Sequence, residues 1–292
     1  MSRQIRPLPP GTPVRPRSWK ELRRRRRRRI WLGRLLFLGG FAGVAALLAF
    51  FLPALGQPVL AAAASFTDGT APAQPTAAPP AAEVHVVAVD PGHGGDDAGA
   101  EGLGFYEDEM TWQTAQELMA LLEADEHFDP RLTREEEETV TPTERAARVR
   151  EMNAELLLSI HGNSDPVYGS SGYECYPVPP GRARNGESVR FGELLAQGFE
   201  AAGASLRGEN GVRYLYYDDN GDKWITEASD PEVHWEFSFT LLEQCGCPAV
   251  LSEQCFVTNS ADVAAFGSDT GCRTSARIYY EAICGWFGLP PA

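Results

Sequence analysis

The stretch Val86-Val87-Ala88-Val89-Asp90-Pro91-Gly92-His93-Gly94-Gly95 decides how the rest of the chain is interpreted. Its run of small and β-branched apolar residues is typical of a buried strand in a parallel sheet. The run stops at Asp-Pro-Gly, which favours a turn, and a histidine between glycines follows. Ligands bind at the carboxyl ends of strands in open α/β sheets. The stretch therefore predicts an α/β fold with a functional His93 at a strand end; a histidine that only caps the turn is the alternative.

A second stretch of the chain ends in the same way. Residues 156–161 read Leu-Leu-Leu-Ser-Ile-His, and a glycine and an asparagine follow. Because the carboxyl ends of parallel strands meet at one edge of a sheet, we expect His161 to lie near His93. Catalytic zinc takes three protein ligands from His, Glu, Asp and Cys, so one carboxylate would complete the set. Glu107 and Glu109, in the segment after His93, both qualify by position.

The N-terminal part of the chain has a different composition. Residues 1–34 hold thirteen Arg and Lys against one acid, whereas the whole chain carries a net charge of −14. Residues 35–52 carry no charge and are nearly long enough to span a bilayer. We therefore expect a basic cytoplasmic tail over 1–29 and a transmembrane signal anchor over 30–52. For the apolar segment, a cleaved signal peptide is the alternative. For the arginine run, the alternative is a nucleic-acid-binding patch, which the apolar segment directly after it disfavours.

The rest of the chain divides into a spacer and a domain. Residues 53–82 are rich in Pro and Ala, cannot bury a core, and predict an extended linker. Residues 83–289 are enough for one α/β domain with a substantial core. This order predicts a single-pass membrane protein, with its N-terminus in the cytoplasm and its domain outside.

Local patterns within the domain predict alternating helices and strands. We expect a helix to begin near Glu107, and the last strand to end in Glu253. The acidic run 218–222 lacks the spacing of a calcium-binding loop, so we expect a solvated turn there. The other expected elements are strands at 128–133 and 172–176, helices from the capping box at 141–144 to Asn153, from Ser188, over 233–245 and over 273–287, and a hairpin over 211–228 around Asn220-Gly221.

The order of these motifs resembles the zinc-dependent N-acetylmuramoyl-L-alanine amidases of the Amidase_3 family. The family places a glutamate fourteen residues after its first histidine, so the resemblance implies Glu107 and not Glu109. It implies a twisted, mostly parallel sheet flanked by helices on both sides, and one Zn²⁺ held by His93, Glu107 and His161, with Glu253 as the catalytic carboxylate. The resemblance extends over essentially all of residues 83–289. The segments that carry it are 90–95, Glu107, 133–134, Arg148, Asn153, 159–163, 248–253 and 256–259.

The resemblance also implies a reaction, hydrolysis of the amide bond between N-acetylmuramic acid and L-alanine in peptidoglycan. Two departures stand beside the site: Asp108 where the family usually has lysine, and Gln254-Cys255 where it usually has any residue followed by glycine. Neither removes a ligand, so we expect activity. A non-catalytic peptidoglycan-binding or regulatory domain, or a zinc peptidase acting on stem peptides, is the alternative. The 211–228 hairpin also looks longer than the family needs.

Several other features receive structural interpretations. The six cysteines form no C-x-x-C pair, which disfavours a zinc ribbon; disulfides and isolated buried thiols fit equally well. Cys255 either packs inertly or is oxidisable. Arg134 and Arg148 are expected to hold the fold together or to meet carboxylates of a stem peptide. The remaining histidines are expected to be a core or edge side chain (His85), an exposed loop residue (His127) and a surface ion partner of Glu232 and Glu236 (His234).

The expected partners are peptidoglycan and, through the N-terminal helix, the membrane; no nucleic acid is expected, and the sequence identifies no activating protein. A membrane anchor with one amidase domain resembles the amidases of spore-cortex formation, although vegetative cell separation fits as well.

Overall fold

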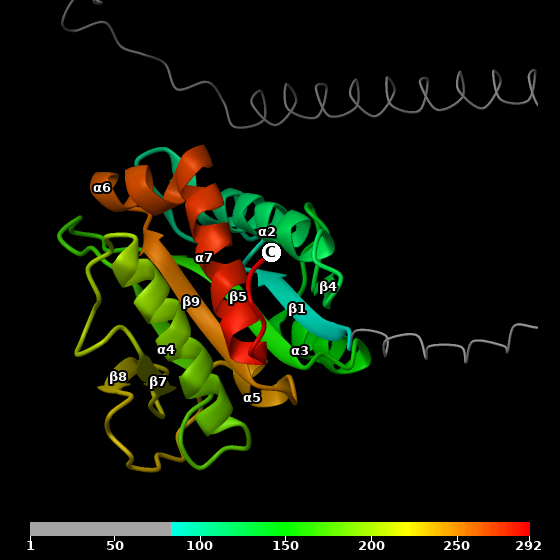
Figure 1. The fold of residues 1–292 in the computed structure, drawn as a ribbon. Coiled ribbons are helices and arrows are strands. Elements are labelled where there is room, and N and C mark those ends of the chain that lie inside the picture. Colours follow the sequence, from blue (N-terminus) through cyan, green and yellow to red (C-terminus); the bar gives the residue numbers. More distant parts are fainter. Residues whose placement is uncertain (1–82) are drawn as a thin grey trace, which may run out of the picture. The chain divides into compact units, whose positions relative to one another are not determined.

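A five-stranded sheet with the order β4-β1-β5-β9-β6 forms the centre of the fold (Figure 1). The computed structural model describes residues 83–292, so the expected tail, anchor and linker over 1–82 lie outside the described residues. Within residues 83–292, no helix is long and apolar enough to cross a membrane. Four strands are parallel and the edge strand β6 (Glu174–Pro177) is antiparallel; the parallel ones are β1 (His85–Pro91), β4 (Phe128–Leu132), β5 (Leu156–Asn163) and β9 (Ala249–Phe256).

Helices cover both faces of this sheet because side chains alternate along each strand. Val87 and Val89 belong to one buried cluster, whereas Ala88 between them belongs to another. The first cluster packs under α2 (Glu107–Glu123), α4 (Asn185–Ala201) and α7 (Asp269–Phe287), and the second under α3 (Pro142–Glu151) and α5 (Thr240–Gln244). Figure 1 shows α4 and α7 crossing in front of the sheet. The prediction of a mostly parallel sheet flanked by helices is confirmed.

Helix boundaries follow the caps that the sequence provides. The predicted capping box is present: the Thr141 hydroxyl accepts from the Glu144 amide, and the Glu144 carboxylate accepts from the Thr141 amide. Helix α4 begins at Asn185, three residues before the predicted Ser188, whose hydroxyl instead donates to the Arg184 carbonyl. The remaining short elements are β2 (Glu101–Gly102), β3 (Phe105–Tyr106), α6 (Ser260–Asp262) and the π-helical turn η2 (Val263–Gly267).

The predicted helix over 233–245 is wrong for most of its length. Only α5 is helical, and the residues before it run extended beside β7 (Arg213–Tyr217). The Arg182 guanidinium donates to the carbonyls of His234 and Glu236, which a helix would need as its own acceptors. A contact from a residue far away in the sequence therefore overrides the local apolar spacing.

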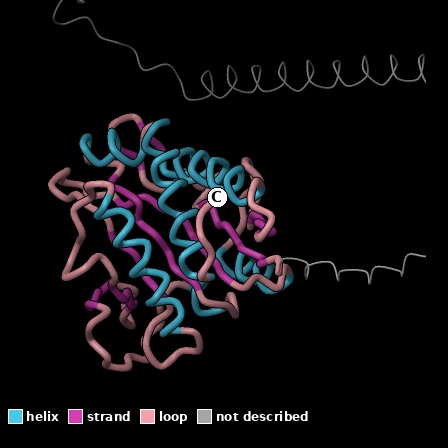
Figure 2. Tube along the Cα trace, viewed as in Figure 1, coloured by secondary structure: helices cyan, strands magenta, loops and turns pink. Residues whose placement is uncertain are grey.

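The predicted hairpin is confirmed, as β7 paired antiparallel with β8 (Lys223–Glu227). Its turn contains Gly221 at φ +82°, a conformation that favours glycine, and the Asp218 carboxylate accepts from the amides of Asn220 and Asp222. Figure 2 shows the two strands lying apart from the main sheet, connected by long loops. The acidic run is therefore a hydrogen-bonded turn.

The order of the strands fixes where a ligand can bind. The chain leaves β1 for β4 on one side and returns to β5 on the other, so a crevice opens at the carboxyl ends of β1 and β5. Strand β9 continues past the predicted end at Glu253 to Phe256, and Glu253 pairs in register with His161 of β5. All six cysteines are buried and free.

Candidate metal centre and active site

His93 follows β1 in a left-handed backbone conformation, with φ 57°. This conformation is uncommon for a residue with a side chain and persists only where neighbouring contacts enforce it. Arg145 of α3 donates to the His93 carbonyl, and the Gly94 amide donates to the Asp97 carbonyl over 2.7 Å. The turn is thereby fixed, and the His93 ring is held at the sheet edge.

Asp97 determines which nitrogen of His93 is available. One Asp97 carboxylate oxygen lies 2.8 Å from His93 Nδ1, while its other oxygen accepts from the Gly99 amide. A carboxylate at Nδ1 favours the tautomer with the proton on that nitrogen, which leaves Nε2 free to bind a metal. The sequence analysis missed Asp97; its spacing four residues after His93 was the available signal.

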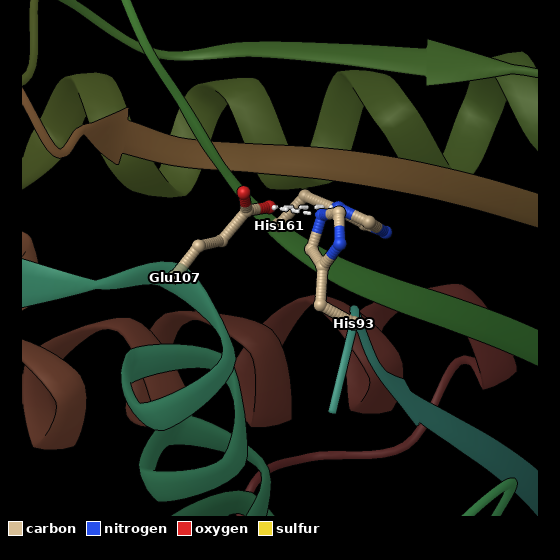
Figure 3. A group of neighbouring side chains, drawn as sticks. All are labelled: His93, Glu107 and His161. Atoms are coloured by element: carbon tan, nitrogen blue, oxygen red, sulfur yellow. Dashed lines mark hydrogen bonds and ion pairs between the residues drawn. The ribbon is translucent and has the colours of Figure 1, made fainter. Parts of the chain in front are cut away.

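Glu107 is the first residue of α2 and brings the two histidines together (Figure 3). Its Oε1 lies 3.1 Å from His93 Nε2 and 2.9 Å from His161 Nδ1, and also accepts from the Gly162 amide. The ligand atoms of the three residues all lie within 4.8 Å of one another. Of the two glutamates left open by position, the structure brings Glu107 into this group.

The charges of this group depend on one another. Burial raises the pKa of Glu107, but hydrogen bonds from His161 and His93 outweigh burial and hold that pKa well below its usual value. Burial lowers the pKa of His93, but Glu107 and Asp97 raise it to about 9. Metal ligands must be deprotonated, so a divalent cation would replace the protons that these ring nitrogens share with Glu107.

The donor set fits a catalytic zinc ion. Two imidazole nitrogens and one carboxylate oxygen are a ligand combination of catalytic zinc sites, which keep a further position open for water or substrate. Gly92 makes room for the His161 ring, because a Cβ at Gly92 would lie 2.5 Å from that ring. His93, Glu107 and His161 are therefore the residues that would hold the ion.

Glu253 lies beside this group on β9, in register with His161. Its Oε2 is buried and has no hydrogen-bond partner among the described residues. Burial raises the pKa of Glu253 well above its usual value, and the charges of Glu107 and Glu174 raise it further. A buried carboxyl group that lacks a hydrogen-bond partner and lies beside the metal ligands suits proton transfer better than structural pairing.

These four residues line one cleft of about 650 Å³. The volume is in the range of ligand sites in proteins. Its lining combines charged groups from the sheet edge with aromatic groups from the hairpin region, including Asp90, His93, Asp97, Glu107, Arg145, His161, Asn163, Tyr217, Lys223, Phe237, Phe239 and Glu253.

Arg145 is a second residue that the sequence analysis missed. It is buried and pairs with Asp90 over 2.8 Å, and it donates to the backbone oxygens of Val140 and Pro91 as well as of His93. The sequence around Arg145 predicts a helix but not this role. Except for Val140, the partners of Arg145 lie more than fifty residues away in the sequence.

The other singled-out arginines have structural roles. Arg134 is 2% exposed and donates to the carbonyls of Pro91 and Gly92, while Arg148 pairs with Glu138 over 2.6 Å. The structure thus favours the structural interpretation of both over contact with a stem peptide.

The side chains expected outside the site also have partners. Cys255 is 1% exposed and packs 3.6 Å from Met110 Sδ, so the inert alternative holds. His85 stacks on Phe287. The expectation that His127 is exposed is wrong: it is half-buried, because its ring lies 2.8 Å from an Asp125 oxygen.

Among the described residues, a second group could also hold a metal ion: Asp230, Glu232 and His234. The Glu232 side chain is 70% exposed, and His234 lies 4.0 Å from it, as expected for a surface ion partner. Solvated carboxylates of this kind commonly occur without a metal, and the group lies outside the cleft lining.

Comparison with known proteins agrees with this geometry. The Amidase_3 family model, described as N-acetylmuramoyl-L-alanine amidase, matches residues 87–285. The chain therefore belongs to the Amidase_3 family of N-acetylmuramoyl-L-alanine amidases.

Individual relatives are more distant. The probable amidase AmiB of Haemophilus influenzae is 29% identical over 222 residues, which cover 68% of this chain and 51% of AmiB, so the match spans about half of that relative. The sporulation-specific amidase of Bacillus subtilis is 37% identical over 92 residues, covering 31% of this chain and 35% of that protein. The catalytic domain of the amidase CwlV from Bacillus (Paenibacillus) polymyxa has the same fold, with a TM-score of 0.56 and 23% identity over 70% of this chain and 99% of that domain.

Proposed function

We propose that this protein is a zinc-dependent hydrolase that cleaves the amide bond between N-acetylmuramic acid and L-alanine in peptidoglycan. The observation that carries the proposal is the meeting of His93, Glu107 and His161 at one sheet edge, beside the unpartnered carboxyl of Glu253. Membership of the amidase family supports the choice of bond.

The residues of the chain have separate roles in this reaction. Zinc, when bound, supplies Lewis acidity that lowers the pKa of a water molecule and polarises a carbonyl group. Glu253 accepts a proton from the attacking water and delivers it to the nitrogen of the departing L-alanine. Asp97 holds His93 in the tautomer that presents Nε2.

The first test of this function uses the full-length chain with zinc and intact peptidoglycan, and reads the soluble products by mass spectrometry. We expect stem peptides that begin with free L-alanine, lost after chelation and restored by added zinc. Release of amino acids from the stems would instead indicate a peptidase. If no products form although zinc is bound, cell extract is added. Activity that appears with the extract indicates a required partner, and continued inactivity indicates a non-catalytic binding domain.

A second test addresses the carboxylate behind His93. Asp97→Ala is expected to weaken zinc binding by about 10- to 100-fold, because the ring loses the partner that fixes its tautomer and orientation. Competition with a chromophoric chelator measures the affinity. Asp96→Ala, at the exposed neighbouring carboxylate, is the matched control and should bind zinc as the unchanged protein does; equal affinities for both variants would contradict the role of Asp97.

We also propose that residues 30–52 anchor the protein in the bacterial cell membrane, with the amidase domain outside the cytoplasm. The steep change from the arginine run to the uncharged segment 35–52 supports this orientation. Similarity to a sporulation-specific amidase favours a role in the spore cortex over vegetative cell separation. Transcript levels in sporulating and in growing cells test the role in the spore cortex. Membrane fractionation of the full chain, compared with a chain that starts at residue 83, tests the anchor.

A further inference from the structure

The hairpin β7–β8 and the extended residues after it form one wall of the cleft. Tyr217, Lys223, Phe237 and Phe239 of this wall line the same cavity as the metal-ligand group. The wall is held by backbone pairing, in which the Tyr217 amide donates to the Phe237 carbonyl over 2.8 Å. The backbone of β7 and that of the extended segment are therefore held together by hydrogen bonding.

Lys223 is the charged residue that this wall contributes to the cleft lining. It is one of only two lysines in the chain, the other being Lys20, and it begins β8 opposite Tyr217. Its ammonium lies 6.0 Å from the centre of the Tyr217 ring. Lys223 is exposed; within residues 83–292 it forms no ion pair, although its charge lowers the pKa of Glu253.

Two acidic residues close to Lys223 in the sequence, Asp218 and Asp222, form hydrogen bonds within the turn. Asp218 accepts from the backbone amides of the turn, and Asp222 donates its own amide to Asp218. The other permanent cation of the cleft lining, Arg145, is buried and paired with Asp90. Lys223 is thus the one permanent cation of the described cleft lining that is available to a ligand.

We propose that Lys223 determines specificity by binding a carboxylate of the stem peptide next to the scissile bond. This inference rests on the proposed function. The residue after L-alanine in a stem peptide is D-glutamate linked through its γ-carboxyl, so its α-carboxylate is free unless the cell wall amidates it. That group lies one residue from the scissile amide, a separation of about 3.8 Å between Cα atoms. An ammonium attracts the carboxylate as a point charge and loses this attraction for the neutral amide.

The test compares two soluble substrates that differ in this one group. They are N-acetylmuramoyl-L-Ala-D-Glu with its γ-carboxyl capped as the methylamide, and the α-carboxamide of the same compound, each given to the full-length chain with zinc. We expect the unchanged protein to favour the acid by about tenfold in kcat/KM, mainly through KM, as one charge-assisted contact predicts. Lys223→Met should abolish the preference, chiefly by raising KM for the acid, and Lys223→Arg should retain most of it.

Arg277→Met is the matched control, because it also removes an exposed positive charge, on α7 and outside the cleft lining. It should keep the preference for the acid. A preference that persists in Lys223→Met, or that Arg277→Met loses equally, overturns the proposal.

A second measurement needs no turnover. Acylation of the Lys223 amine by an N-hydroxysuccinimide ester is read by mass spectrometry, with the γ-methylamide of N-acetyl-L-Ala-D-Glu or the α-amide of that compound present. We expect protection by the acid and none by the amide; equal acylation with both overturns the proposal. If neither substrate is hydrolysed while the acid still protects Lys223, the proposed reaction fails but binding of the carboxylate stands.

Discussion

Glu253→Gln is expected to lower turnover by about 10³-fold or more, while one zinc ion remains bound per chain. The substitution keeps the size and shape of the side chain and removes its ability to accept a proton. Because Glu253 Oε2 has no hydrogen-bond partner among the described residues, the change breaks no contact of that atom in the fold. Hydrolysis of a soluble muropeptide and zinc content by elemental mass spectrometry measure the two halves of the expectation.

The control for this variant is Glu117→Gln on α2, which changes a partly exposed carboxylate in the same way and should hydrolyse normally. Near-normal hydrolysis by Glu253→Gln would show that another group moves the proton. Loss of zinc along with activity would instead make Glu253 a part of the metal site.

Arg145→Met is expected to lower the free energy of unfolding by about 3–5 kcal/mol at pH 7. The substitution leaves the Asp90 carboxylate buried without its cation, and also removes the donor to the His93 carbonyl. Denaturant unfolding of the metal-free protein measures the change. Arg148→Met lies on the same helix, but its pair with Glu138 is partly exposed, so it should cost about 1 kcal/mol or less.

The pH dependence of this loss has a predictable sign. Burial raises the pKa of Asp90, but the charge of Arg145 and hydrogen bonds from Ser159 and Thr133 outweigh burial and hold that pKa below its usual value. The resulting stability is complete above the unfolded pKa, about 3.9, and is lost as the pH falls through the lower folded value. Without Arg145, burial prevails and the folded pKa rises, so protonation relieves the variant. The gap between the two proteins should therefore narrow in acid; a widening gap would contradict this account.

The sequence predicts those parts of the fold and site that depend on local patterns. The strands ending near His93 and His161, the capping box at Thr141 and the Asn220-Gly221 turn are each specified by a few adjacent residues. These features place two histidines at one sheet edge without knowledge of any distant contact.

The remaining parts depend on contacts between distant segments. The wrong helix over 233–245 follows from apolar spacing alone, which cannot reveal that Arg182 takes its carbonyl groups. Arg145 was missed for the same reason, because its pairing with Asp90 exists only in the folded chain. The choice of Glu107 over Glu109 came from family resemblance, and the structure brings Glu107 to the histidines.

The six free and buried cysteines affect where this protein can mature. With no covalent cross-link among them, folding of the domain waits for no oxidant and no isomerase, and reducing agents have no bond to break. The domain can therefore reach the same native state in a reducing compartment and in an oxidising one.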